Sequence, residues 1–151
     1  MNKLIAIVDQ LRDYIPQYQL VDNTISEASI GWHIEHSCLV IIKITETVKG
    51  SDSTKYQHRF NFKKWYVFLT GKFPRGRAKA PASVLPVDNI TQESLMDSIA
   101  RAKNAVIELG DCTKNQYFLH PIFGNLNKTE TIPFLAIHTK HHLRIIQDMN
   151  H

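Results

Sequence analysis

The sequence predicts an all-α protein, an up-down-up-down four-helix bundle with a short extra aromatic helix and a long loop. Four long segments repeat apolar residues with the 3.6-residue period of amphipathic helices. No intervening stretch shows the apolar–polar alternation of a strand, and long helices joined by loops are typical of a bundle. At 151 residues, the chain is expected to form a single domain around one core, over residues 1–151.

The first two helices are predicted over residues 3–14 and 29–48. Apolar side chains recur every three or four positions in each of them, which indicates one buried face. Pro16 is expected to end the first helix because it has no backbone N–H to donate. Ser26 or Ser29 is the candidate N-cap of the second, since a serine hydroxyl can accept a hydrogen bond from a first-turn amide.

The third helix is predicted to be short, over residues 61–69, and unusually rich in aromatic side chains. Three prolines follow it and make residues 73–88 an extended loop. A connection of this length without secondary structure of its own is often a lid or a binding loop.

The last two helices are predicted over residues 91–110 and 127–148, and residues 117–126 between them are predicted to be a loop. Asn127 and Glu130 are spaced as in a capping box, in which each side chain accepts from the other residue's backbone N–H. This pair marks the start of the final helix.

The composition is that of an ordinary globular protein, with 43% hydrophobic and 21% charged residues. The apolar run at residues 4–8 is too short for a signal peptide or a membrane span, so we expect a cytoplasmic protein with no membrane association. The two cysteines, Cys38 and Cys112, form no CxxC unit, and Cys38 is interpreted as a small buried hydrophobe.

The formal net charge of +4 is unevenly distributed. Residues 61–87 hold six cations and no acid, and four of the six lie in the loop at residues 72–81. This stretch is interpreted as a solvated loop that can attract a small anionic substrate. Because no aromatic residue alternates with the cations between Arg75 and Pro81, as happens where bases stack, we expect no nucleic-acid partner.

The most informative feature is a pair of histidines near the C-terminus. His138 and His142 are four residues apart, so they lie one turn apart on the same face of a helix. Leu135, Ile145 and Met149 continue that face and direct it toward the core. Two imidazoles at this spacing are a common way to hold a divalent metal. The alternative is that both are core histidines hydrogen-bonded to their neighbours.

A third ligand is expected from the second helix, where either His33 or His36 can supply it, and spacing alone does not choose between them. Three neutral imidazoles leave positions open for water or substrate, as a catalytic site requires, and they suit zinc, nickel or iron. The HExxH motif is absent, which disfavours a peptidase. His120, shortly before the final helix, is the candidate general base or partner of a metal ligand, unless its role is only structural.

Three short motifs resemble the DinB/YfiT-like superfamily. Residues 29–36, SIGWHIEH, resemble the S-[IV]-G-x-x-x-x-H start of its second helix. Residues 138–144, HTKHHLR, resemble the H-x-x-H-H-L-R motif of its last helix. Residues 120–126, HPIFGNL, resemble an HP-x-FG-x-L element found in one branch. Together the three motifs extend the resemblance from about residue 26 to the end of the chain.

The resemblance implies a four-helix bundle with a divalent metal held by three histidines. The first ligand of the superfamily matches His36, and the other two match His138 and His142, so the resemblance favours His36 over His33. It also makes a homodimer an expectation. Many relatives have a glutamine where this chain has Ile145.

Relatives include transferases and isomerases that use bacillithiol, mycothiol or glutathione, in which the metal lowers the pKa of a thiol or water. The leading hypothesis is therefore a metal-dependent enzyme acting on a small molecule, a low-molecular-weight thiol S-transferase first. The alternatives are a metal-dependent hydrolase and a non-catalytic binding or stress-linked bundle.

Overall fold

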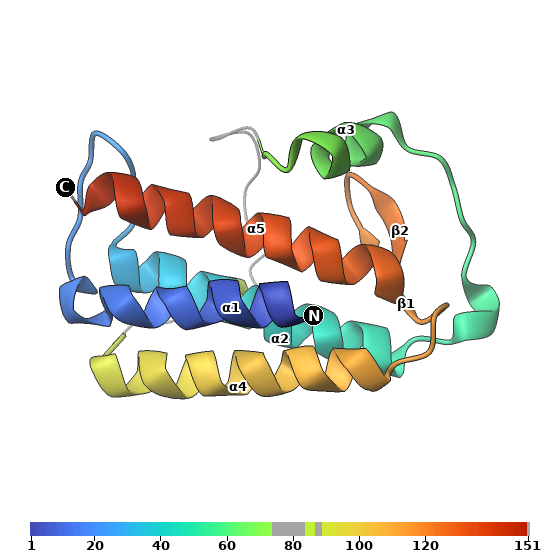
Figure 1. The fold of residues 1–151 in the computed structure, drawn as a ribbon, viewed down its shortest axis with the longest axis horizontal. Coiled ribbons are helices and arrows are strands. Elements are labelled where there is room, and N and C mark those ends of the chain that lie inside the picture. Colours follow the sequence, from blue (N-terminus) through green and yellow to red (C-terminus); the bar gives the residue numbers. More distant parts are fainter. Residues whose placement is uncertain (74–83, 87–88, 151) are drawn as a thin grey trace.

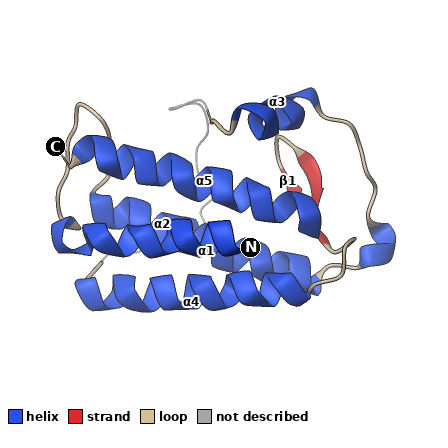
Figure 2. Ribbon diagram, viewed as in Figure 1, coloured by secondary structure: helices blue, strands red, loops and turns tan. Residues whose placement is uncertain are grey.

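The computed structural model describes residues 1–73, 84–86 and 89–150, so most of the predicted loop at 73–88 lies outside the described residues. The described part is mostly helical, with one small hairpin (Figures 1 and 2). The elements in chain order are α1 Asn2–Gln10, a 3₁₀ helix Leu11–Gln17, α2 Ile30–Gly50, a 3₁₀ turn Ser53–Lys55, α3 Phe62–Thr70, α4 Gln92–Asp111, β1 Tyr117–His120, β2 Gly124–Asn127 and α5 Lys128–Met149.

Four helices form the bundle: α2 packs against α4 and α5, and α1 packs against α4 and α5 (Figure 1). The predicted up-down-up-down topology is wrong, because α2 and α4 run in the same direction. Lys49 and Glu108, near the C-terminal ends of α2 and α4, form an ion pair of 2.6 Å. The reason is the long connection between these helices, which carries α3 and returns the chain to the end where α2 began. The order is therefore up-down-down-up.

The first predicted helix is confirmed in its N-terminal part and differs at its end. The α-helix gives way to a 3₁₀ helix at Leu11, and Pro16 lies inside that helix instead of ending it. A 3₁₀ turn is a frequent form of a helix terminus. Leu4, Val8 and Leu11 are fully buried, so the apolar face continues from the α-helix into the 3₁₀ helix.

At the start of α2, Ser29 is the N-cap, and its hydroxyl accepts from the backbone N–H of Trp32. Ser26, the other candidate, has different partners. At the end of α3, Gly71 has a φ of 62°, the left-handed conformation that glycine adopts without strain, and it ends the helix.

The segment at residues 117–126, predicted to be a loop, is an antiparallel hairpin (Figure 2). Tyr117 pairs with Asn127, and His120 pairs with Gly124, whose φ is 71°. Phe118 and Leu126 are buried. The strands are four residues each, too short for an alternating pattern to stand out from a loop.

The start of α5 has the predicted capping box, which is confirmed. The Asn127 side chain accepts from the backbone N–H of Glu130, and the Glu130 carboxylate accepts from that of Asn127. We expect Asn127→Ala to lower the free energy of unfolding by about 1 kcal/mol. Thermal unfolding measures this loss. Asn104→Ala, on the exposed face of α4, is the matched control and should cost nothing; equal effects of the two would contradict the prediction.

The core lies between the four long helices and is built from aliphatic side chains of all of them. The apolar residues that flank the histidines of α5 are buried as expected: Leu135, Ile145 and Met149. Cys38 is fully buried, and burial raises the pKa of its thiol, which supports its interpretation as a small hydrophobe. Within the described residues, no helix is long and apolar enough to cross a membrane.

Candidate metal centre

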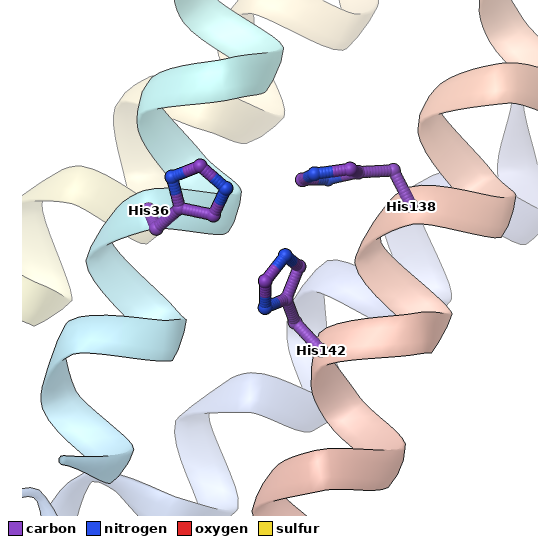
Figure 3. A group of neighbouring side chains, drawn as sticks. All are labelled: His36, His138 and His142. Atoms are coloured by element: carbon purple, nitrogen blue, oxygen red, sulfur yellow. The ribbon is translucent and has the colours of Figure 1, made fainter. Parts of the chain in front are cut away.

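Three histidines from two helices meet inside the bundle (Figure 3). His36 comes from α2, and His138 and His142 come from adjacent turns of α5. One ring nitrogen from each lies within 4.8 Å of the others. The figure shows a nitrogen of each ring directed toward the space between them. The structure thus joins the pair predicted from its spacing to a third imidazole on the helix expected to supply it.

The spacing of the rings is close to that of a metal site. Ring centroids are 4.7 Å apart for His138 and His142, 4.8 Å for His36 and His142, and 5.3 Å for His36 and His138. Imidazole nitrogens bound to one ion at about 2.0–2.1 Å lie roughly 3.3 Å from each other. The ligand atoms all lie within 4.8 Å of one another, so binding of an ion would require them to approach that separation.

The outer nitrogen of His36 is held by the backbone. Its Nδ1 lies 2.8 Å from the carbonyl oxygen of Val84, and because a carbonyl can only accept, Nδ1 carries the proton. The Nε2 atom of His36 is therefore left with a free lone pair. A ligand histidine usually has such a partner on its second nitrogen, which fixes the tautomer and orients the ring.

His138 contributes a buried nitrogen without a partner. Its Nδ1 has no hydrogen bond to any of the described residues, although it is buried. A buried polar atom left unpaired costs about 1–3 kcal/mol, so native proteins rarely keep one without a reason. Together with two further neutral imidazoles, this donor set fits a divalent cation of borderline softness, such as zinc, nickel or iron.

The histidines stay neutral at physiological pH. Burial, and then the neighbouring imidazoles, lower the pKa of His138 to about 3 and hold that of His142 well below its ordinary value. Burial also lowers the pKa of His36, against the opposing effect of its bond to Val84. Neutral imidazole is the form that binds a metal, so no proton has to be removed before an ion can bind.

Aromatic side chains enclose the cluster. Trp32 stacks on His36 with 4.8 Å between ring centroids, and Phe134 stacks on His138 at 6.1 Å. Phe73 contacts His138 edge to face. These rings limit access of water to the imidazoles, which strengthens electrostatic interactions within the site.

The structure places His33 beside the cluster, as a neighbour of His142. The two Nδ1 atoms are 3.0 Å apart, and the Nε2 atom of His33 is 3.0 Å from the hydroxyl of Ser26. The spacing of His33 and His36 left either as the third member, and the structure assigns that position to His36. The hydrogen-bonded position of His33 was not predicted, because only the packing of α2 on α5 brings it to His142.

His120 lies in the hairpin turn at the end of β1. Its Nδ1 accepts from the backbone N–H groups of Ile122 and Phe123, and its ring stacks on Phe123 at 4.5 Å. Burial lowers the pKa of His120 to about 4. Phe134 contacts the rings of both His120 and His138. The observed bonds close the turn, and a catalytic role for His120 stays a prediction.

The basic stretch is only partly described. Lys64, one of its six cations, points inward and forms a 2.7 Å ion pair with Glu130 at the start of α5. The loop cations Arg75, Arg77 and Lys79 lie outside the described residues.

Comparisons with protein-family models, curated proteins and solved structures find no match for this chain. The structure shows a mostly helical fold and a buried cluster of His36, His138 and His142 that can bind a metal.

Proposed function

We propose that His36, His138 and His142 hold a divalent metal ion, and that the protein is a metal-dependent enzyme of the DinB/YfiT-like type. The observation that carries the proposal is the convergence of three neutral, buried imidazoles from two helices, with ligand atoms within 4.8 Å of one another. The unpartnered Nδ1 of His138 supports it further. Three protein ligands leave at least one coordination position for a substrate or water.

The chemistry that follows from such a site is activation of a nucleophile. A divalent ion with an open position lowers the pKa of a thiol or water that binds there. The chain's own residues hold the imidazoles neutral, orient His36 through Val84, and surround the site with the rings of Trp32 and Phe134. Transfer of a low-molecular-weight thiol to a small substrate is the first candidate reaction, and hydrolysis is the second.

The first test is elemental analysis of the protein purified without added metal. We expect about one divalent ion per chain for the wild type, and almost none for the double variant His138→Ala/His142→Ala. His58→Ala is the matched control, because His58 is exposed and remote from the cluster in sequence. Equal metal content in the double variant and the wild type would rule out this site.

The second test distinguishes the two reactions. The metal-loaded protein is incubated with an electrophilic substrate and bacillithiol, mycothiol or glutathione, and then with ester and amide substrates without thiol. Turnover only with a thiol supports the transferase, and turnover without one supports the hydrolase. A protein that binds metal and turns over neither class would favour a non-catalytic binding bundle.

A further inference from the structure

Behind His142, a chain of hydrogen bonds extends to the segment that precedes α2. The Nδ1 atoms of His142 and His33 are 3.0 Å apart, and Nε2 of His33 is 3.0 Å from Oγ of Ser26. We infer that His33 and Ser26 are positioning residues, which hold His142 in the tautomer whose Nε2 is free to bind the ion. This inference rests on the proposed metal site.

The chemistry of imidazole decides which group donates and which accepts in each of these hydrogen bonds. A neutral ring has one N–H donor and one acceptor nitrogen, so the contact between the two Nδ1 atoms needs a proton on one side only. If Nε2 of His142 is to bind an ion, the proton must sit on its Nδ1. His142 then donates to His33, whose own proton lies on Nε2 and is donated to Ser26. The opposite direction places a proton on Nε2 of His142, where it blocks the ion.

Ser26 is held in place to receive this proton. Its hydroxyl oxygen accepts from the backbone N–H of Ala28 at 3.1 Å, and its own backbone N–H donates to the carbonyl of Asp22 at 2.8 Å. An oxygen has two lone pairs, so Oγ can accept from Ala28 and from His33 together. The acceptor at the end of the chain is therefore part of a structured turn.

Because His142 and His33 are buried, the tautomer of His142 depends on these hydrogen bonds and not on water. The side chain of His33 is packed in the core, with the residue only 4% exposed, so water cannot easily replace it as acceptor. His36 has a different arrangement, because the carbonyl of Val84 can only accept and needs no further partner. The tautomer of His142 depends on a second titratable ring, and that ring depends on Ser26.

The test compares two substitutions of His33 in the full-length protein. His33→Leu removes the acceptor and retains apolar packing, and it should weaken Zn²⁺ binding by about 10- to 100-fold, the usual effect of losing such a partner. In His33→Asn, the side-chain oxygen takes the place of Nδ1 and can still accept from His142, so most of the affinity should return. Affinity is measured by competition with a chromophoric chelator. Thr45→Val, which removes a buried hydroxyl elsewhere on α2, is the matched control.

Two results would overturn the inference and leave the metal site intact. One is unchanged affinity in His33→Leu while His138→Ala/His142→Ala loses the ion. The other is equal weakening in His33→Leu and His33→Asn, which would show that only the volume of the ring matters. A wild type that takes up no Zn²⁺ would overturn the site and the inference together.

A direct measurement does not depend on how the variants fold. Nitrogen-15 NMR of the Zn²⁺-loaded wild type reports which nitrogen of each imidazole carries a proton. We expect the Nδ1–H form for His142 and the Nε2–H form for His33. A proton on Nδ1 of His33 in the loaded protein would contradict the proposed direction.

Discussion

The metal-free protein should lose stability steeply as the pH falls below 6.5. Burial lowers the pKa of His33 and His120 to about 4 and that of His138 to about 3, whereas the same side chains in the unfolded chain have a pKa near 6.5. Between these values the unfolded state binds protons that the folded state does not. Stability is therefore fully present above pH 6.5 and declines as the pH falls toward 4.

The size of this effect follows from proton linkage. In that pH range, each histidine that is protonated only in the unfolded state contributes a slope of about 1.4 kcal/mol per pH unit. Urea denaturation at a series of pH values from 7.5 to 4 measures the total slope. His138→Leu should reduce it by the contribution of one histidine. A free energy of unfolding that stays constant over this range would show that the histidines are not buried as neutral rings.

Metal should oppose this acid sensitivity. An ion bound to the three imidazoles stabilises the folded state by mass action and competes with protons for the same nitrogens. Adding excess Zn²⁺ is expected to raise the unfolding temperature more at pH 7 than at pH 5. No such rise is expected for the His138→Ala/His142→Ala variant.

The helices were predictable because each has a strong local signal. Amphipathic periodicity marks the buried faces, and the Asn127–Glu130 pair marks the start of α5 almost to the residue. The direction of the helices was not predictable in the same way, because periodicity shows which face is buried and not which way a neighbour runs. The connection from α2 to α4 is long enough to return along the bundle, and that length was the available clue.

The candidate site also has one part that local spacing predicts and one part that depends on how the helices pack. The spacing of His138 and His142 fixes their common face, and this depends only on the geometry of one helix. The choice between His33 and His36 depends on how α2 packs against α5, which spacing cannot supply; the motif resemblance chose His36, and the structure places it in the cluster. The contact between His33 and His142 joins residues 109 positions apart, so no local pattern could indicate it.

The ion pair between Lys64 and Glu130 should be the strongest single attachment of α3. The side chains are only 10% and 22% exposed, and the two charges are 2.7 Å apart. Glu130 also accepts from the backbone N–H of Asn127 in the capping box. Removing the carboxylate therefore leaves a largely buried ammonium group unpaired and weakens the start of α5 at the same time.

We expect Glu130→Ala to lower the free energy of unfolding by about 3 kcal/mol, the low end of the range for breaking a buried ion pair. Glu130→Gln should cost less, because its single amide oxygen can still accept from either Lys64 or the backbone N–H of Asn127, which bond to different oxygens of Glu130. Hydrogen exchange in α3 should accelerate in Glu130→Ala, since Val67 is the only other side chain of that helix that is fully packed into the core among the described residues.

A double-mutant cycle separates the pair from the cap. Lys64→Met removes the ammonium group and keeps the aliphatic stem, and it should leave the capping box intact. If the pair itself stabilises α3 on α5, the double variant Lys64→Met/Glu130→Ala will lose less than the sum of the single variants, because no buried charge is left without a partner. Additive losses would mean that Glu130 acts only through the cap, and α3 would then depend on its apolar contacts alone.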